Sequence, residues 1–149
     1  MSQAKKIFFA IVVKDEEKSE KIKKLIGNWY RNSESHIFNS WEQFVDKTTE
    51  NRLLVFDAVI GEYGDINFEN KSGIQNALQA KRALAKAGIW FPLAVGLCKT
   101  ILAMPLFIGL SFTVVNYDSL DGLEDALRSY LVTTGVIKKT EKRAKLRIR

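Results

Sequence analysis

Residues 51–61 are Asn-Arg-Leu-Leu-Val-Phe-Asp-Ala-Val-Ile-Gly, and this stretch decides the predicted fold. Its four apolar residues, Leu53 to Phe56, are typical of a buried strand that ends in a carboxylate, Asp57. An unpaired carboxylate at the rim of a core is costly to desolvate, so we expect Asp57 to have a partner. A second strand pattern, Lys6–Val13, is followed by Lys14-Asp15-Glu16. In one parallel sheet these acids would meet at the carboxyl ends of the strands, where open α/β sheets bind ligands.

Strand and helix patterns alternate along the rest of the chain. The predicted strands are Ile7–Val13, His36–Asn39, Leu53–Phe56, Leu93–Leu97 and Phe112–Val115. The predicted helices are Glu16–Trp29, one from Trp41 with Ser40 as N-cap, Gly73–Ala87, Lys99–Leu110, and one that carries Leu120 to Leu131 after Asp118 or Ser119 as cap. Gly61–Gly73 is expected to be a polar loop. Five alternations predict an α/β fold, a five-stranded parallel sheet with helices on both faces.

The charge of the chain is concentrated at its C-terminal end. The chain has 149 residues and a net charge of +6, and residues 138–149 hold seven basic residues and one acid. Removing these from totals of 23 basic and 17 acidic residues leaves 16 of each in residues 1–137. We therefore expect one domain over residues 1–137 and a basic tail over 138–149. The tail could touch nucleic acid or an acidic lipid surface. It has no aromatic residue for stacking on bases, so sequence-specific nucleic-acid recognition is not expected, and a solvated, partly helical tail is the usual explanation of such a run.

The rarer residue types exclude several classes of site. A single cysteine, Cys98, allows no internal disulfide, and a single histidine, His36, argues against His-based triads and His-rich metal sites. No signal peptide pattern is present, so we expect a cytoplasmic protein. Ile89–Val115 is apolar enough to be weighed as a membrane span, but Pro92 and the further breaks in it favour a buried strand, helix and strand.

Several short motifs resemble the receiver domain of two-component response regulators. They are Val12-Val13-Lys14-Asp15-Glu16-Glu17, Leu54-Val55-Phe56-Asp57, Ser72-Gly73-Ile74, Ala87-Gly88-Ile89-Trp90-Phe91-Pro92 and Leu123-Glu124, within a resemblance that runs from Lys6 to Leu131. The resemblance implies a flavodoxin-like three-layer sandwich. It also implies that Asp57 is the phospho-acceptor and that Asp15 and Asp57 hold Mg²⁺.

The chain departs from the family at the positions that assist phosphoryl transfer. The first acid after strand one is replaced by Lys14, whose ammonium would compete with Mg²⁺ for Asp57. The switch hydroxyl falls at Leu97, or at Cys98 if the match shifts by one residue. The family's lysine after strand five falls at Asn116. These departures predict a degenerate receiver in which Mg²⁺ binds weakly or not at all.

Both acids also have structural interpretations. Asp57 could cap a loop or pair with Lys14. Asp15 could be the N-cap of the first helix, with Glu16 and Glu17 in its first turn.

The segment Lys99–Leu110 is apolar on nearly every side. An exposed apolar helix marks an interface, because soluble monomers seldom expose large apolar patches. The sequence therefore predicts a contact surface, for a homodimer or a signalling partner, formed by this helix with strand five and the last helix. Its residues would be Ile101, Leu102, Leu106, Phe107 and Tyr117.

The function expected from these features is that of an atypical receiver-like protein that acts through protein contacts and is not an enzyme. One alternative is a phosphorylatable single-domain response regulator with Asp57 as its Mg²⁺-dependent acceptor. Another is a small nucleotide-binding enzyme on the same fold. No glycine-rich phosphate loop follows the first strand, which weakens this last alternative.

Overall fold

The computed structural model describes residues 6–51, 53–64, 72–99 and 111–138. The elements in chain order are β1 Ile7–Val12, α1 Glu16–Trp29, β2 Ser33–Phe38, α2 Trp41–Glu50, β3 Ala58–Gly64, α3 Ser72–Lys86, β4 Leu93–Cys98, β5 Thr113–Asn116 and α4 Leu123–Thr133. The five strands are parallel and lie in the order β2-β1-β3-β4-β5. This is the α/β arrangement of flavodoxin-like proteins, and the predicted fold class is confirmed.

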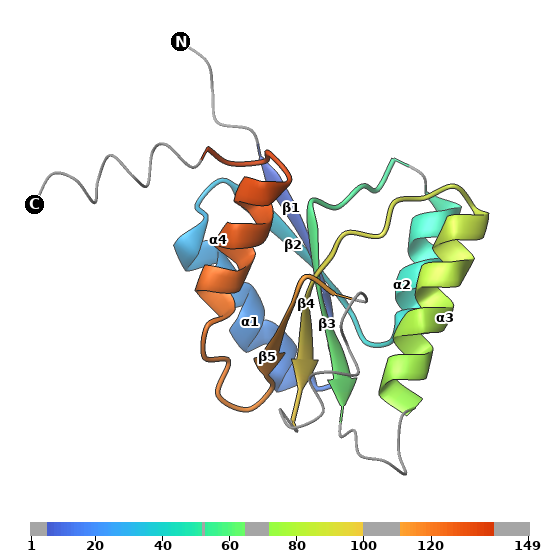
Figure 1. Cartoon of the computed structure of the whole chain (residues 1–149), viewed down its shortest axis with the longest axis horizontal. Helices are drawn as coiled ribbons and strands as arrows, with labels where there is room; N and C mark the ends of the chain where they lie inside the picture. Colours follow the sequence, from blue (N-terminus) through green and yellow to red (C-terminus); the bar gives the residue numbers. More distant parts are fainter. Residues whose placement is uncertain (1–5, 52, 65–71, 100–110, 139–149) are drawn as a thin grey trace, which may run out of the picture.

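The helices form two layers on either side of the sheet (Figure 1). α1 and α4 cover one face, where a core cluster joins Ile22 and Ile26 of α1 to Leu127 and Leu131 of α4. α2 and α3 cover the other face with a second cluster that is rich in aromatic side chains. β1, β3 and β4 are the central strands, and because helices cover both faces of the sheet, most of their side chains are buried.

Helix periodicity and capping residues predicted the first two helices well. α1 has the predicted bounds, and Asp15 is its N-cap, accepting a hydrogen bond of 2.9 Å from the backbone N–H of Lys18. Ser40 caps α2 in the same way, accepting from the N–H of Gln43 at 3.0 Å. Each cap satisfies an N–H group that has no partner within its own helix.

The prediction for the third strand is wrong. β3 begins at Ala58, after Asp57, and the apolar run Leu53–Phe56 forms the connection that leads into it. The side chain of Leu53 is 92% exposed and that of Val55 is 67% exposed, whereas Phe56 is buried. The first four residues of the predicted loop Gly61–Gly73 belong to β3 instead.

Smaller differences concern element ends. β2 begins at Ser33, three residues before its predicted start. Neither Asp118 nor Ser119 caps α4, whose N-cap is Gly122 with a left-handed φ of 83°. The predicted helix Lys99–Leu110 lies outside the described residues from position 100 onward. Within the described ranges, none of the helices has the length and apolar character that crossing a membrane requires.

Two glycines in neighbouring strands leave room for aromatic rings. A Cβ atom at Gly61 of β3 would collide with the ring of Trp41, and one at Gly96 of β4 with the ring of Tyr63. Tyr63 is the extra residue of a bulge, because Glu62 pairs with Leu97 and Gly64 with Cys98. Such bulges redirect a side chain, and this one lays the Tyr63 ring across Gly96.

We predict that Gly61→Ala and Gly96→Ala each lower the free energy of unfolding by about 1–3 kcal/mol, because overpacking forces a buried ring to move. Gly27→Ala on α1 is the matched control, since nothing lies within 4 Å of its Cβ position. That control should be neutral or should stabilise the helix by up to about 1 kcal/mol. Urea denaturation measures all three variants, and equal stability of the Gly61 and Gly27 variants would contradict the packing described.

Burial raises the pKa of Tyr63 to about 12, against the opposing effect of the nearby Ser111 side chain. Between about pH 10 and 12 the unfolded chain loses this proton while the folded chain keeps it, so stability should fall as pH rises. The contribution is fully present below pH 10, and its loss amounts to roughly 3 kcal/mol by pH 12. Denaturation at pH 8 and pH 11 should show a smaller loss for Tyr63→Phe than for the unaltered chain. An equal loss in both proteins would show that Tyr63 ionises freely.

Candidate functional site

The carboxyl ends of β1 and β3 form the point at which this sheet order places ligands. Val12 pairs with Gly61, so the residues that follow β1 lie beside Glu62. The backbone N–H of Lys14 donates a hydrogen bond to the Glu62 carboxylate, and the Asp15 carboxylate caps α1. Both acids at this end therefore bind backbone groups of the chain itself.

Tyr117 lies at the same end, immediately after β5. Its ring is flanked by two ammonium groups, with Lys18 Nζ 4.9 Å and Lys99 Nζ 5.1 Å from the ring centre. Lys18 Nζ also donates to the backbone oxygen of Asp118 at 3.3 Å. Burial raises the pKa of the Tyr117 hydroxyl, and the negative charges of Glu62, Asp15 and Asp118 raise it further. Acids, lysines and an aromatic ring thus fill this end of the sheet.

Asp57 lies at the opposite end of the sheet. The Asp57 carboxylate accepts a 2.8 Å hydrogen bond from the backbone N–H of Phe8. The backbone N–H of Asp57 donates to the backbone oxygen of Phe8 at 2.7 Å. Asp15 follows Phe8 by seven residues of mostly extended chain, which at about 3.3 Å per residue is roughly 20 Å. The predicted Mg²⁺ site of Asp15 and Asp57 is therefore wrong, and so is the predicted pairing of Asp57 with Lys14. The cause is the later start of β3.

The other positions carried over from the receiver family are either buried in the core or hydrogen-bonded to the backbone. Leu97 is fully buried in the core, and the Asn116 side chain accepts a hydrogen bond of 2.8 Å from the N–H of Ser119. Cys98 is also fully buried, as expected for a small apolar residue. Neither switch position presents a hydroxyl or an ammonium group to the carboxyl end of the sheet.

The predicted contact surface is only partly described. Ile101, Leu102, Leu106 and Phe107 lie outside the described residues. Tyr117 is only 8% exposed, and its ring lies between two lysines. Little of this ring is available to a partner, and the contact surface as a whole stays a prediction.

Metal binding needs several ligands that converge. Across residues 6–51, 53–64, 72–99 and 111–138 there is no group of three or more His, Cys, Asp or Glu side chains with that arrangement. The acids at the carboxyl end, Asp15 and Glu62, already accept backbone N–H donors and have lysines as neighbours. These residues do not fit the carboxylate-rich coordination that Mg²⁺ prefers.

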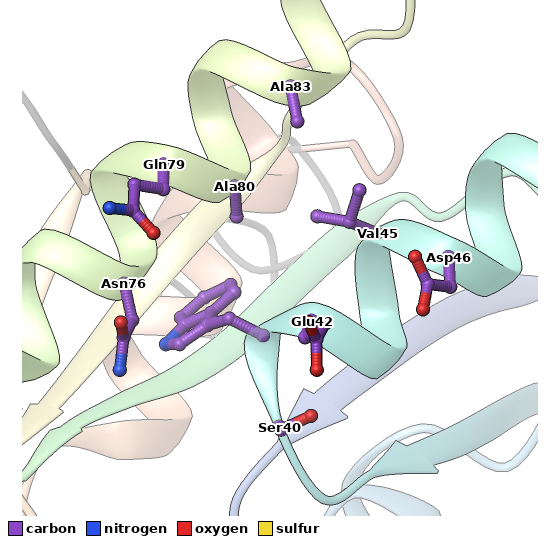
Figure 2. A pocket seen from close by; sticks show the side chains of 9 residues that line it. Ser40, Glu42, Val45, Asp46, Asn76, Gln79, Ala80 and Ala83 are labelled. Carbon is purple, nitrogen blue, oxygen red and sulfur yellow. The ribbon is translucent and has the colours of Figure 1, made fainter.

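A groove of about 440 Å³ lies between α2 and α3 on the aromatic face of the sheet. Figure 2 shows Val45 of α2 directed toward Ala80 and Ala83 of α3. The polar side chains around these apolar residues are Ser40, Glu42 and Asp46 from α2 and Asn76 and Gln79 from α3.

The groove owes its shape to residue size and helix periodicity. Ala80 and Ala83 are small, so α3 leaves space where larger side chains would fill it. Glu42 and Asp46 are four residues apart, which puts both carboxylates on one face of α2. The indole N–H of Trp41 donates a hydrogen bond of 3.1 Å to the backbone oxygen of Glu62. This bond fixes the ring, which lines the groove. In the described part of the chain, neither Glu42 nor Asp46 forms an ion pair, so the rim is acidic.

Sequence reasoning missed Glu62 and the groove. Glu62 falls within the predicted loop Gly61–Gly73, whereas the structure places it in β3. The β-branched pair Val59-Ile60 immediately before Gly61 was the available signal for β3. The groove had only a weak signal, since the alanines of α3 look like ordinary helix-forming residues.

Comparisons with known proteins support the fold alone. No protein-family model and no curated protein matches the chain. One solved structure with a similar fold is a chain described as the yeast Spc42 trimeric coiled coil, amino acids 181–211, fused to another structure. It is 16% identical to this chain, with a TM-score of 0.64, and the match covers 97% of this chain and 91% of that one. At this identity the likeness shows that the two chains share an α/β architecture.

Proposed function

We propose that this chain is a receiver-like signalling module that acts by binding another protein and does not accept a phosphoryl group. The observation that carries this proposal is that the acids at the ends of β1 and β3 are hydrogen-bonded to backbone N–H groups. Glu62 accepts the N–H of Lys14, and Asp15 caps α1. Mg²⁺-dependent phosphoryl transfer at this end of the sheet would need acids free to hold the metal, and both of these accept backbone N–H groups.

The chemistry of phosphoryl transfer supports the same proposal. Transfer to a carboxylate needs a nucleophile next to the acids that hold Mg²⁺, together with a cation that neutralises the developing charge. The nucleophile expected from the resemblance, Asp57, lies at the amino end and bonds the Phe8 N–H. The residue that takes its place at the carboxyl end of β3 is Glu62, beside Lys14, which replaces an acid of the family motif.

The groove between α2 and α3 supplies a surface for contact with a protein. Its apolar base of Val45, Ala80 and Ala83 suits the methylene groups of a lysine or arginine, while Glu42 and Asp46 suit the charged end of that side chain. The partner segment proposed here is a basic amphipathic helix or strand.

We predict that acetyl phosphate with Mg²⁺ adds no phosphoryl group to the chain, as measured by intact mass. Beryllofluoride should leave the fluorescence of Trp41 unchanged, and this ring is a close reporter because its N–H bonds the Glu62 backbone. The control variants are Glu62→Gln and Asp57→Asn. A phosphoryl adduct that disappears in either variant would refute the proposal and identify the acceptor.

We predict that a lysine-rich amphipathic peptide binds the groove and that Asp46→Lys weakens its binding several-fold, because the variant reverses one charge of the rim. Glu20→Lys is the matched control, since Glu20 is an exposed acid on α1, on the opposite face of the sheet. Titration followed by NMR measures both affinities, with the amides of α2 and α3 as reporters. Equal losses of affinity in the two variants would mean that only overall charge attracts the peptide.

A further inference from the structure

Exposed apolar side chains gather at the amino end of the sheet. The exposed large hydrophobic residues of the described chain are Leu53 at 92%, Val55 at 67%, Trp90 at 75% and Phe112 at 47% exposure. Each of them precedes a strand: Leu53 and Val55 precede β3, Trp90 precedes β4, and Phe112 precedes β5. Parallel strands begin at one edge of a sheet, so these four residues, called the amino-end patch below, lie at one end of the molecule.

The amino-end patch is held in place by specific contacts. Burial raises the pKa of Tyr130 on α4, and the side chain of Trp90 beside its hydroxyl opposes that rise. The ring of Phe112 lies 5.4 Å from the Tyr130 ring, edge to face. Val55 and Trp90 line the same depression of about 260 Å³. Trp90 therefore lies at the surface beside α4 and Val55 with most of its area exposed.

The basic part of the sequence continues from the same end. α4 runs from the carboxyl end to the amino end of the sheet (Figure 1). Val136 and Ile137 after it pack against the core cluster that contains Ile7 of β1, and the described chain stops at the next residue. The backbone N–H groups of Val136 and Ile137 donate to the Leu131 oxygen, which fixes the direction in which the chain leaves α4. Residues 138–149, whose seven basic residues carry the excess charge of the protein, therefore start beside this end.

The acids at this end do little to offset that charge. Glu34 pairs with Lys6 and with His36, and the Asp57 carboxylate binds the Phe8 N–H. Glu50, at the end of α2, is the exposed acid that remains among the described residues of this end. Arg31 follows α1 and Lys86 ends α3 at this end. With Lys6 they balance Glu34, Glu50 and Asp57, so the local acids leave the charge of the tail unopposed.

We propose that the amino end of the sheet docks on a membrane surface that contains anionic lipid. Trp, Leu and Val side chains partition into the interfacial layer of a bilayer, and Trp is enriched there. A cluster of basic residues is drawn to anionic headgroups within a Debye length of the surface. A nucleic acid would use the charge and leave Leu53 and Val55 in water, whereas a lipid surface uses both features. The amino-end patch shares no residue with the α2–α3 groove, so this docking does not depend on the proposed partner binding.

The test is co-sedimentation of the full chain with vesicles of phosphatidylcholine, with and without phosphatidylserine. We expect binding to the vesicles that contain phosphatidylserine, with an affinity that falls as salt is raised and is at least about tenfold weaker for neutral vesicles. Brominated acyl chains should quench tryptophan fluorescence in the bound protein, and Trp90→Phe should remove most of that quenching.

Two pairs of variants separate the apolar and the charged contributions. Leu53→Ser should weaken binding several-fold without loss of stability, because this side chain is almost fully exposed, whereas Ala85→Ser on exposed α3 should have no effect. Replacing Lys142, Arg143 and Lys145 by Gln should weaken binding about tenfold or more. The same change at Lys21, Lys23 and Lys24, which are exposed on α1, should matter far less.

Three results would overturn the proposal. The first is a lack of binding to vesicles with phosphatidylserine. The second is binding that Leu53→Ser and Trp90→Phe leave unchanged in both affinity and quenching, since this would mean that charge alone acts. The third is a concentration-dependent dimer that buries Trp90 in the absence of lipid, detected by light scattering and lost in Trp90→Ala, because the patch would then be a contact between two copies.

Discussion

The hydrogen bonds between Asp57 and Phe8 fix how β3 enters the sheet, and the rest of the structure depends on this entry. The Asp57 carboxylate accepts the backbone N–H of Phe8, and the Phe8 oxygen accepts the N–H of Asp57. The acid thereby extends the pairing of β1 with β3 one residue before Phe9 pairs with Ala58. A hydrogen bond to a charged group contributes about 1.5–3 kcal/mol, which is enough to favour this register over a neighbouring one. A shift of one residue would turn Val59 and Tyr63 toward the opposite face of the sheet.

This register decides which chemistry the two ends of the sheet can support. It places Glu62, and not Asp57, at the carboxyl end of β3, where the N–H of Lys14 reaches its carboxylate. It also places Gly61 under Trp41, so that α2 can approach the sheet closely. The position of β3 therefore has two consequences. It gives the Glu62 carboxylate a backbone partner, and it lets α2 lie where it forms the groove with α3.

The sequence predicted most of the architecture because helix signals are long and redundant. α1 combines an apolar stripe, an acidic first turn and an Asp cap, and its bounds were predicted to the residue. β3 was misplaced because a four-residue apolar run can be a buried strand or a half-buried connection, and periodicity alone does not separate the two. In the connection, Leu54 and Phe56 pack inward while Leu53 and Val55 face solvent. The candidate site followed this error, since the position of Asp57 relative to Asp15 depends entirely on where β3 begins.

Glu62 also could not be assigned a role from the sequence, because its partner is a backbone N–H. Backbone donors carry no residue identity, so a carboxylate that binds one leaves no pattern of paired residue types in the sequence. The same is true of Asp57 with Phe8 and of Asp15 with Lys18. Asp15 and Asp57, the predicted metal-binding pair, and Glu62 are thus each used to hold a strand or a helix in place. Where carboxylates are used in this way, binding falls to other surfaces, which in our proposals are the acidic rim of the groove and the exposed apolar residues at the other end of the sheet.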